Sequence, residues 1–357
     1  MVYFLFGTKA QIIKSEFILY ELFKKNIEIN IINTNQHVEI TKNILNNFNF
    51  PFKYLQLNNR TKNANSISRI LFFFLKNLFI ILFKNFDIEK NKYCILHGDT
   101  LSTFLGVVFC KKYKLKIIHV EAGYSSKNIF KPFPEELIRK IVSYFSDYLV
   151  CDGEAQLKNL KKYKNRKNII SIPQNTIVDS VISKLPNNVN KKNNLIITLH
   201  RTENIFKKNK IKEFVNLINS LNLNFNFDNI TWFVHEATKP KIIKIFGLDY
   251  FKNNNIEIAE LVPHKKFVEI IYSSKAVLTD GGSIKQECSI LNIPTIIWRD
   301  VDDDPTYSTD NIFLSKYSIE NSIIFLEKEF HNRQKEVNIF IDSPSKELVN
   351  KIAPKLI

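Results

Sequence analysis

Short runs of apolar residues alternate with longer mixed segments along the first half of the chain. Continuous apolar runs are typical of strands that are covered on both faces. Residues 2–6 form such a run, and further strands are predicted at the largely apolar segments 27–32, 52–57, 93–96, 116–120, 148–150 and 169–172. The segments between most of them are long enough for helices. This alternation predicts a doubly wound parallel α/β sheet.

The same alternation begins again after a polar segment at residues 184–194, where the change in composition is typical of a domain boundary. A second series of strands is predicted at residues 195–198, 230–234, 256–258, 276–279 and 295–298. We therefore expect an α/β protein with two doubly wound, Rossmann-like domains. The expected bounds are 1–175 and 176–343, with a final helix in 344–357 that packs back on the first domain.

Residues 66–84, SISRILFFFLKNLFIILFK, form the most apolar stretch. Lys76 and Asn77 interrupt it, so its apolar runs are shorter than the roughly 20 residues that a membrane-spanning helix needs. We expect a helix that is buried in the core and in a homodimer interface, and no transmembrane segment. Peripheral contact with a membrane surface through 66–84 is the alternative.

Charge and cysteine content narrow the class of protein. The 357 residues include 51 basic and 35 acidic side chains, a formal charge of +16 that would allow nucleic acid as a partner. The lysines are scattered, however, without an arginine-rich block, which favours a solvated surface and no nucleic-acid partner.

The four cysteines form no CxxC pair, so we expect buried thiols and no disulfide or zinc site. With an apolar N-terminal run too short for a signal peptide, this predicts a cytoplasmic protein.

Acidic side chains follow successive strands between residues 95 and 139. ILHGDT places His97 and Asp99 after one strand, KIIHVEAG places Glu121 after the next, and PFPEELIR opens a helix with Glu135 and Glu136. Ligands of open parallel sheets bind beyond the carboxyl ends of the strands, so these groups are expected to meet there. Several carboxylates in one place indicate acid/base chemistry.

Phosphate-binding features follow strands of the second series. Gly281 and Gly282 open a helix that carries Glu287, and the helix N-terminus suits a diphosphate while the carboxylate suits ribose hydroxyls. A simple turn between strand and helix is the alternative. His200 and Arg201, in LHRTEN, end another strand, and a guanidinium binds phosphate in a fork. A lone histidine at such a place is often structural.

No glycine spacing gives GxGxxG, which argues against a nicotinamide or flavin cofactor. The combination of acidic groups in one domain and a diphosphate site in the other therefore indicates an enzyme that acts on a nucleotide sugar.

HGDT, HVEAG, PFPEELIR, QNTIVD, LHRTEN and DGGSIKQE stand in an order and spacing that resemble the bacterial UDP-N-acetylglucosamine 2-epimerase family over nearly the whole chain. The resemblance implies two Rossmann-like domains in a GT-B-type arrangement with the active site in the interdomain cleft. It also implies a homodimer, a UDP-sugar substrate, and no metal or redox cofactor.

The implied reaction is epimerisation at C2, from UDP-GlcNAc to UDP-ManNAc, by anti elimination of UDP to 2-acetamidoglucal and re-addition, for surface polysaccharide biosynthesis. Asp99, Glu121 and Glu135 match the family's catalytic carboxylates, and His200 matches its catalytic histidine. We expect Asp99 and Glu121 to transfer protons at C2, with the acid and base roles open. Glu135 would stabilise the cation or share the proton, and His200 would face the departing phosphate.

A further set of residues is expected to bind the nucleotide. It comprises Lys9, Lys14, Arg201, Phe267, Gly281, Gly282, Ser283 and Glu287. Three segments depart from the family pattern. GTKAQ replaces GTRPE, so Lys9 lacks the fork of an arginine, and SGG becomes Gly281–Gly282–Ser283. After Trp298, Asp304 and Thr306 flank Pro305 where arginine and glutamate are usual, which leaves the nucleotide and sugar preference open.

Several functions remain as alternatives. The PFPEELIR helix favours the non-hydrolysing branch over a hydrolysing 2-epimerase that releases ManNAc and UDP. A GT-B glycosyltransferase would need an acceptor site in place of a ring of carboxylates. An inactive nucleotide-sugar-binding protein is the non-enzymatic alternative, suggested by the altered GTKAQ and DDDPTY segments.

Overall fold

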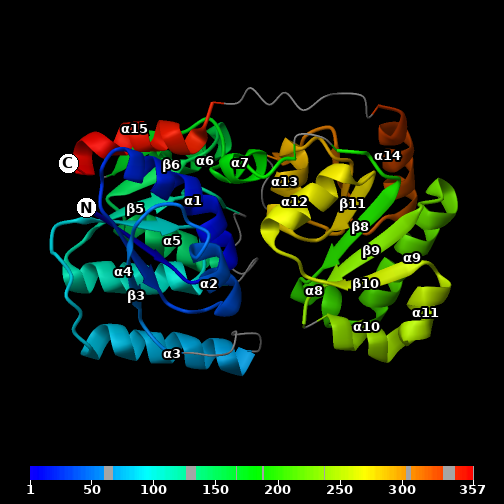
Figure 1. Cartoon of the computed structure of the whole chain (residues 1–357), viewed down its shortest axis with the longest axis horizontal. Coiled ribbons are helices and arrows are strands. Elements are labelled where there is room, and N and C mark those ends of the chain that lie inside the picture. Colours follow the sequence, from blue (N-terminus) through cyan, green and yellow to red (C-terminus); the bar gives the residue numbers. More distant parts are fainter. Residues whose placement is uncertain are drawn as a thin grey trace. The chain divides into compact units, whose positions relative to one another are not determined.

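A computed structural model describes residues 1–59, 67–125, 134–165, 167–186, 189–236, 238–302, 307–332 and 342–356. The chain divides into two compact units (Figure 1). Unit 1 comprises Met1–Ser180 and Ile341–Ile357, and unit 2 comprises Val181–Phe340.

Unit 1 contains a sheet of seven strands, all paired in parallel, in the order β3-β2-β1-β4-β5-β6-β7. The strands are β1 (Val2–Phe6), β2 (Ile29–Asn33), β3 (Lys53–Gln56), β4 (Tyr93–His97), β5 (Lys116–Val120), β6 (Tyr148–Cys151) and β7 (Asn168–Ser171). The helices are α1 (Lys9–Lys24), α2 (Glu39–Leu45), α3 (Ile67–Phe83), α4 (Leu101–Tyr113), α5 (Glu135–Phe145), α6 (Glu154–Leu160), the short 3₁₀ helix η1 (Lys161–Tyr163), α7 (Ile177–Ile182) and α15 (Pro344–Leu356).

Both faces of this sheet are covered, which explains why its central strand is apolar throughout. Val2, Phe4 and Phe6 of β1 belong to the core beneath α1 and α15. Tyr3 and Leu5 point the other way, into the core beneath α3 and α4. Successive side chains of a strand face opposite sides, so a doubly covered strand needs apolar residues at every position. The two helix layers can be followed in Figure 1.

Helix α3 is only partly buried within unit 1. Phe73 and Ile81 are buried against the sheet and α4. Six other large apolar side chains are between 50% and 71% exposed: Leu71, Phe72, Leu75, Phe79, Leu82 and Phe83. The helix is therefore buried along one face only, and the opposite face is an apolar surface of unit 1. Among the described helices, none has the length and apolar content to cross a membrane.

Unit 2 contains a second parallel sheet in the order β10-β9-β8-β11-β12-β13. Its strands are β8 (Asn194–Leu199), β9 (Asn229–Val234), β10 (Ile256–Glu260), β11 (Ala276–Thr279), β12 (Thr295–Ile297) and β13 (Ile312–Leu314). Its helices are α8 (Thr202–Ile205), α9 (Lys208–Phe225), α10 (Lys239–Phe246), α11 (Leu248–Asn253), α12 (His264–Ser273), α13 (Gly282–Ile290) and α14 (Ile319–Asn332). Trp232 and Trp298 are buried in its core. The α/β prediction of two doubly wound sheets is confirmed.

Candidate active site

The sheet of unit 1 brings the acidic residues of three adjacent strands to one edge. Asp99, Glu121 and Asp152 each follow the carboxyl end of a strand, β4, β5 or β6, and these strands are neighbours. Sequence reasoning placed Asp99 and Glu121 at this edge and did not single out Asp152.

Glu121 is the most tightly held of these carboxylates. Its Oε1 accepts hydrogen bonds from Lys14 Nζ at 2.5 Å and from Asn175 Nδ2 at 2.6 Å, and its Oε2 lies 3.4 Å from His97 Nε2. The residue has φ of +64°, in the left-handed region that side chains other than glycine rarely adopt. Such backbone strain persists where the surroundings over-determine the conformation, and it is common at functional sites.

The glycine of HGDT makes room for this carboxylate. Gly98 has φ of +69°, and a Cβ at this position would lie 3.3 Å from Glu121 Oε2. Burial opposes ionisation of Glu121, but the neighbouring Lys14 and His97 outweigh it and hold its pKa well below the ordinary value. Glu121 is therefore an anion at neutral pH.

Asp99 is held by an arginine that the sequence reasoning did not select. Arg139 of α5 donates to Asp99 Oδ2 from Nε at 2.7 Å and from its NH2 group at 2.6 Å. Its NH1 group also donates to Glu136 Oε2 at 3.2 Å, and Ser125 Oγ donates to Glu136 Oε1 at 2.6 Å. Arg139 stands three residues after Glu136, a helical spacing that was visible in PFPEELIR. Glu135, the first residue of α5, is partly exposed beside this group.

Asn175 of the QNTIVD segment joins two of the acidic residues. Its Nδ2 donates to Glu121 Oε1 and to Asp152 Oδ2, each at 2.6 Å. Tyr124 OH also donates to Asp152 Oδ2, at 2.8 Å. The amide therefore fixes Glu121 relative to β6, a role that only the folded chain reveals because Asn175 is distant in sequence from Glu121.

The altered GTKAQ segment has a structural role. Gln11 Oε1 accepts from the backbone N–H of Gly7 and Thr8 at 3.0 and 3.1 Å, which completes a capping box at the start of α1. Gln11 Nε2 donates to the carbonyl of His97 at 2.8 Å, so this glutamine links α1 to the HGDT turn. Lys9, partly exposed, is the first residue of α1.

In unit 2, a buried aspartate organises the end of β8. Asp280 is fully buried, and its Oδ1 lies 3.1 Å from His200 Nδ1. The same carboxylate accepts from the backbone N–H of His200 and Arg201 and from Asn204 Nδ2. Burial raises the pKa of Asp280, but His200 and these hydrogen bonds lower it more, to about 2. Asp280 was not predicted, although it directly precedes the glycine pair.

The nucleotide-binding candidates of unit 2 are grouped at the starts of α12 and α13. Gly281 and Gly282 lead into α13, Ser283 is exposed in its first turn, and Glu287 is buried farther along it. Arg201 Nε donates to the Asp280 carbonyl at 3.1 Å, next to the glycine pair. Phe267 of α12 is partly exposed and packs edge-on against Phe233, with ring centroids 5.6 Å apart.

The segment after Trp298 is tied to the same helix. Lys285 is buried in α13 and donates from Nζ to both carboxylate oxygens of Asp302, at 2.7 and 2.6 Å, and to Ser308 Oγ at 3.0 Å. Asp304, Pro305 and Thr306, which distinguish this segment from the family pattern, lie outside the described residues.

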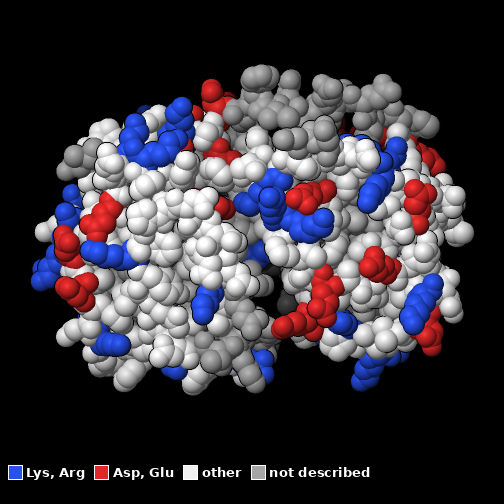
Figure 2. Space-filling view, viewed as in Figure 1, with Lys and Arg blue, Asp and Glu red and all other residues white. Residues whose placement is uncertain are grey.

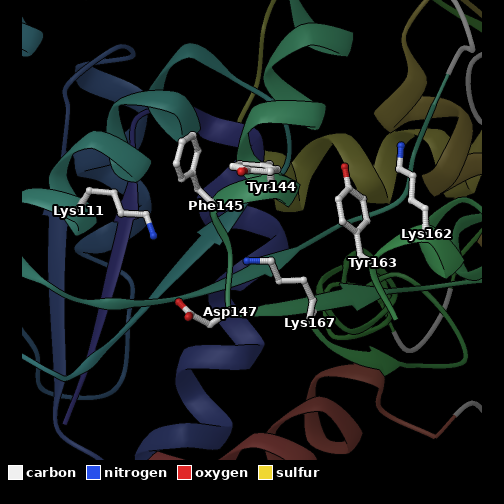
Figure 3. Close-up of a pocket in the computed structure, with 7 residues that line it drawn as sticks. All are labelled: Lys111, Tyr144, Phe145, Asp147, Lys162, Tyr163 and Lys167. Carbon is white, nitrogen blue, oxygen red and sulfur yellow. The ribbon is translucent and has the colours of Figure 1, made fainter. Parts of the chain in front are cut away.

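A separate pocket of about 410 Å³ lies in unit 1 (Figure 3). Its lining consists of Lys111, Tyr144, Phe145, Asp147, Lys162, Tyr163 and Lys167. These residues stand at the ends of α4 and α5 and just before β6 and β7, so the pocket is at the amino edge of the sheet. Asp99, Glu121 and Asp152 lie at the opposite, carboxyl edge of the sheet. On the face shown in Figure 2, basic side chains form small separate groups interspersed with acidic ones.

Comparison with known proteins identifies the family. A family model described as UDP-N-acetylglucosamine 2-epimerase matches residues 21–346. The UDP-N-acetylglucosamine 2-epimerase of Methanocaldococcus jannaschii is 31% identical over 315 residues, which cover 84% of this chain and 83% of that protein. The enzyme of the same name from Methanococcus maripaludis is 26% identical, covering 97% of this chain and 96% of the other.

Solved structures agree with the sequence matches. The crystal structure of the M. jannaschii UDP-GlcNAc 2-epimerase in complex with UDP-GlcNAc and UDP matches with a TM-score of 0.81 and 26% identity, covering 99% of both chains. The structure of the Neisseria meningitidis enzyme matches with a TM-score of 0.79 at 22% identity, a likeness of fold. The two parallel α/β units correspond to the GT-B-like fold of these proteins. This chain belongs to the UDP-N-acetylglucosamine 2-epimerase family and is an epimerase.

Proposed function

We propose that the protein interconverts UDP-GlcNAc and UDP-ManNAc without hydrolysis and supplies the product to surface polysaccharide synthesis. The observation that carries the proposal is the pair of fixed carboxylates, Asp99 and Glu121, at the carboxyl edge of unit 1. The M. jannaschii relative supports the choice of substrate, because its crystal structure holds UDP-GlcNAc and UDP.

The difficulty of the reaction lies at C2, whose proton is hardly acidic in the intact sugar. Breakage of the anomeric C1–O bond, with the electron pair leaving on UDP, gives C1 cationic character and makes the C2 proton acidic. A carboxylate takes that proton and C1=C2 forms, giving 2-acetamidoglucal. Return of a proton to the other face of C2 and of UDP to C1 gives the epimer. The reaction involves no net oxidation or reduction, so it needs no redox cofactor.

The environments of the two carboxylates suggest different roles. Arg139 occupies Oδ2 of Asp99, and Oδ1 has no protein partner among the described residues. The Asp99 side chain is also 27% exposed, so a substrate can reach it. In our proposal Asp99 exchanges the proton at C2, because a general base must be within hydrogen-bond distance of that proton.

Glu121 suits electrostatic stabilisation. Its low pKa makes it a weak base that stays ionised, and a fixed anion lowers the free energy of an oxocarbenium-like centre. Glu135 then stabilises the same cation or shares the proton that returns to the opposite face. This division keeps all three predicted carboxylates in the reaction.

The diphosphate is assigned to unit 2. Asp280 engages Nδ1 of His200, so Nε2 is the nitrogen left for the departing phosphate. Arg201 and the amides of Gly281 and Gly282 are proposed to hold the phosphates, with Lys9, Lys14 and Ser283 as further contacts to the nucleotide. Firm retention of UDP would distinguish this enzyme from a hydrolysing one, since lost UDP leaves the glycal open to water.

Incubation with UDP-GlcNAc in deuterated water, followed by NMR, tests the reaction. Deuterium at C2 of an intact UDP-sugar is expected. Free N-acetylmannosamine would instead identify a hydrolysing enzyme, and absence of both would contradict the proposal.

An Asp99→Asn variant should lower exchange by about 10²-fold or more, because general acid–base groups contribute on that scale. Asp87→Asn, at an exposed position, serves as the matched control and should exchange at the wild-type rate. Equal rates for both variants would remove Asp99 from the mechanism.

We also propose that a second copy of the chain covers the apolar face of α3. The exposed residues recur every three to four positions, at 71/72, 75, 79 and 82/83, which is the spacing of a helix–helix seam. A large side chain that is half exposed still offers on the order of 100 Å² to a partner, so six of them offer roughly 600 Å². That approaches the roughly 800 Å² per partner of a standard interface.

A further inference from the structure

A buried histidine in unit 2 contacts the carboxylate that was predicted to bind ribose. His264 Nε2 lies 2.9 Å from Glu287 Oε1. His264 is 9% exposed and Glu287 is 5% exposed. They come from different helices, because His264 is the first residue of α12 and Glu287 lies in α13. Sequence reasoning selected Glu287 and passed over His264.

This contact occupies Oε1 of Glu287 and leaves Oε2 available as an acceptor. Because Nε2 of His264 lies within hydrogen-bond distance of Oε1, Glu287 cannot turn without losing that contact. Oε2 of Glu287 is buried and has no hydrogen-bond partner in the described part of the chain. A buried carboxylate oxygen without a donor is costly, and a ligand that brings hydroxyl donors recovers the loss.

The location of the pair indicates which ligand carries those hydroxyls. α12 follows the edge strand β10 and α13 follows the inner strand β11 of the same parallel sheet, so both helices begin at its carboxyl edge. Phe267 stands one helical turn after His264, on the same side of α12, with a partly exposed ring. The start of α13, with Gly281 and Gly282, suits phosphate groups. A ligand that offers phosphates to the start of α13, a flat base to Phe267 and two hydroxyls to Glu287 is a nucleoside diphosphate.

We propose that His264 is a positioning residue that fixes Glu287 so that Oε2 receives the ribose hydroxyls of a nucleoside diphosphate. The proposal rests on the proposed function, because it takes the UDP portion of the substrate as the ligand. His264 itself need not touch the nucleotide. Its effect is to make the enzyme distinguish a ribose from a sugar that lacks the hydroxyls.

Calorimetric titration of the full-length protein with UDP and with 2′,3′-dideoxy-UDP measures this discrimination directly. The wild type should bind UDP at least about tenfold more tightly, as hydrogen bonds to a charged group are strong. In His264→Ala the ratio should fall to about threefold or less, with the affinity for dideoxy-UDP unchanged. His264→Gln should restore part of the ratio, since its amide can donate to Oε1.

Lys266→Ala is the matched control, because Lys266 is exposed on the same helix, and it should keep the wild-type ratio. In steady-state kinetics His264→Ala should raise KM for UDP-GlcNAc about threefold or more and leave kcat within about twofold, as expected for lost uniform binding.

Other results would overturn the inference. An unchanged UDP preference in His264→Ala, or an equal fall in affinity for both ligands, would leave His264 with a purely structural role. A wild type that binds both ligands equally would show that Glu287 does not read the ribose, while the proposed reaction would stand. A wild type that binds no UDP would overturn the proposed function as well. If His264→Ala does not fold, His264→Asn gives the same readout, because its shorter amide does not reach Glu287 as Gln does.

Discussion

Oδ1 of Asp280 lies 3.1 Å from Nδ1 of His200, and the same carboxylate accepts the backbone N–H of His200 and of Arg201. One buried side chain thus sets both the ring and the main chain at the end of β8. Such a carboxylate fixes the orientation and tautomer of a histidine and leaves the other nitrogen to act on a ligand.

Asp280→Asn should therefore lower kcat more than a loss of one hydrogen bond would suggest. The amide cannot accept on both atoms, and its NH2 group would face the donors of Arg201 and Asn204. We expect kcat for UDP-GlcNAc epimerisation to fall about 10- to 100-fold. The rate of UDP-ManNAc formation or the NMR exchange rate measures the change. A kcat within twofold of wild type would mean that His200 does not need this partner.

The low pKa of Asp280 also predicts an effect on stability at acidic pH. The folded state holds the pKa at about 2, against 3.8 for an unperturbed aspartate. The resulting stabilisation is present above the unfolded pKa and is lost as the pH falls from about 4 to about 2. Its size is about 2 kcal/mol.

Chemical denaturation at pH 6 and at pH 3 measures this contribution by comparing the wild type with Asp280→Asn. The wild type should lose more free energy of unfolding between the two pH values than the variant does, because the variant has no carboxylate at this position. Equal losses in the wild type and in Asp280→Asn would contradict a pKa of about 2 for Asp280.

Lys14 should control the acidic limb of the pH–rate profile. Together with His97 it holds the pKa of Glu121 low despite burial. In Lys14→Met burial is no longer offset by the ammonium, so the pKa of Glu121 should rise and the carboxylate should protonate at higher pH. We expect the acidic limb of kcat to move upward in pH relative to wild type, measured between pH 5 and 9.

Glu16 is partly buried and lies two positions after Lys14 on the same helix. Glu16→Gln is therefore the control, and it should leave the acidic limb of the pH–rate profile in place. A profile of unchanged shape in Lys14→Met would show that the ionised state of Glu121 is not needed for turnover.

Local pattern and tertiary contact contribute differently to what the sequence can predict. The strands were predictable because each doubly covered strand must be apolar throughout, as in β1. Asp99, Glu121 and His200 were predictable as polar residues at strand ends. β13 was missed, since three half-buried residues at a sheet edge give no clear pattern.

The contacts that hold the site were not predictable from local pattern. Lys14 reaches Glu121 across 107 residues, and His200 meets Asp280 across 80. Nothing in their immediate sequence marks such pairs. Helix α3 was predicted to be buried partly in the core and partly in a homodimer interface. Phe73, Ile81 and their neighbours face the sheet, and burial of the opposite face in a dimer stays a prediction.

The apolar face of α3 should decide the oligomeric state. Phe72→Ser with Phe79→Ser removes two aromatic side chains that are 62% and 64% exposed, so the fold loses little while an interface would lose much of its apolar area. Light scattering after gel filtration should show a dimer for the wild type and a monomer for the double variant at micromolar concentration. Leu223→Ser with Leu248→Ser, two exposed leucines of unit 2, is the matched control and should remain dimeric. A wild-type monomer that binds anionic vesicles through this face would instead identify a membrane surface as the partner, since Arg69 and Lys76 give the helix a positive charge without any acidic residue.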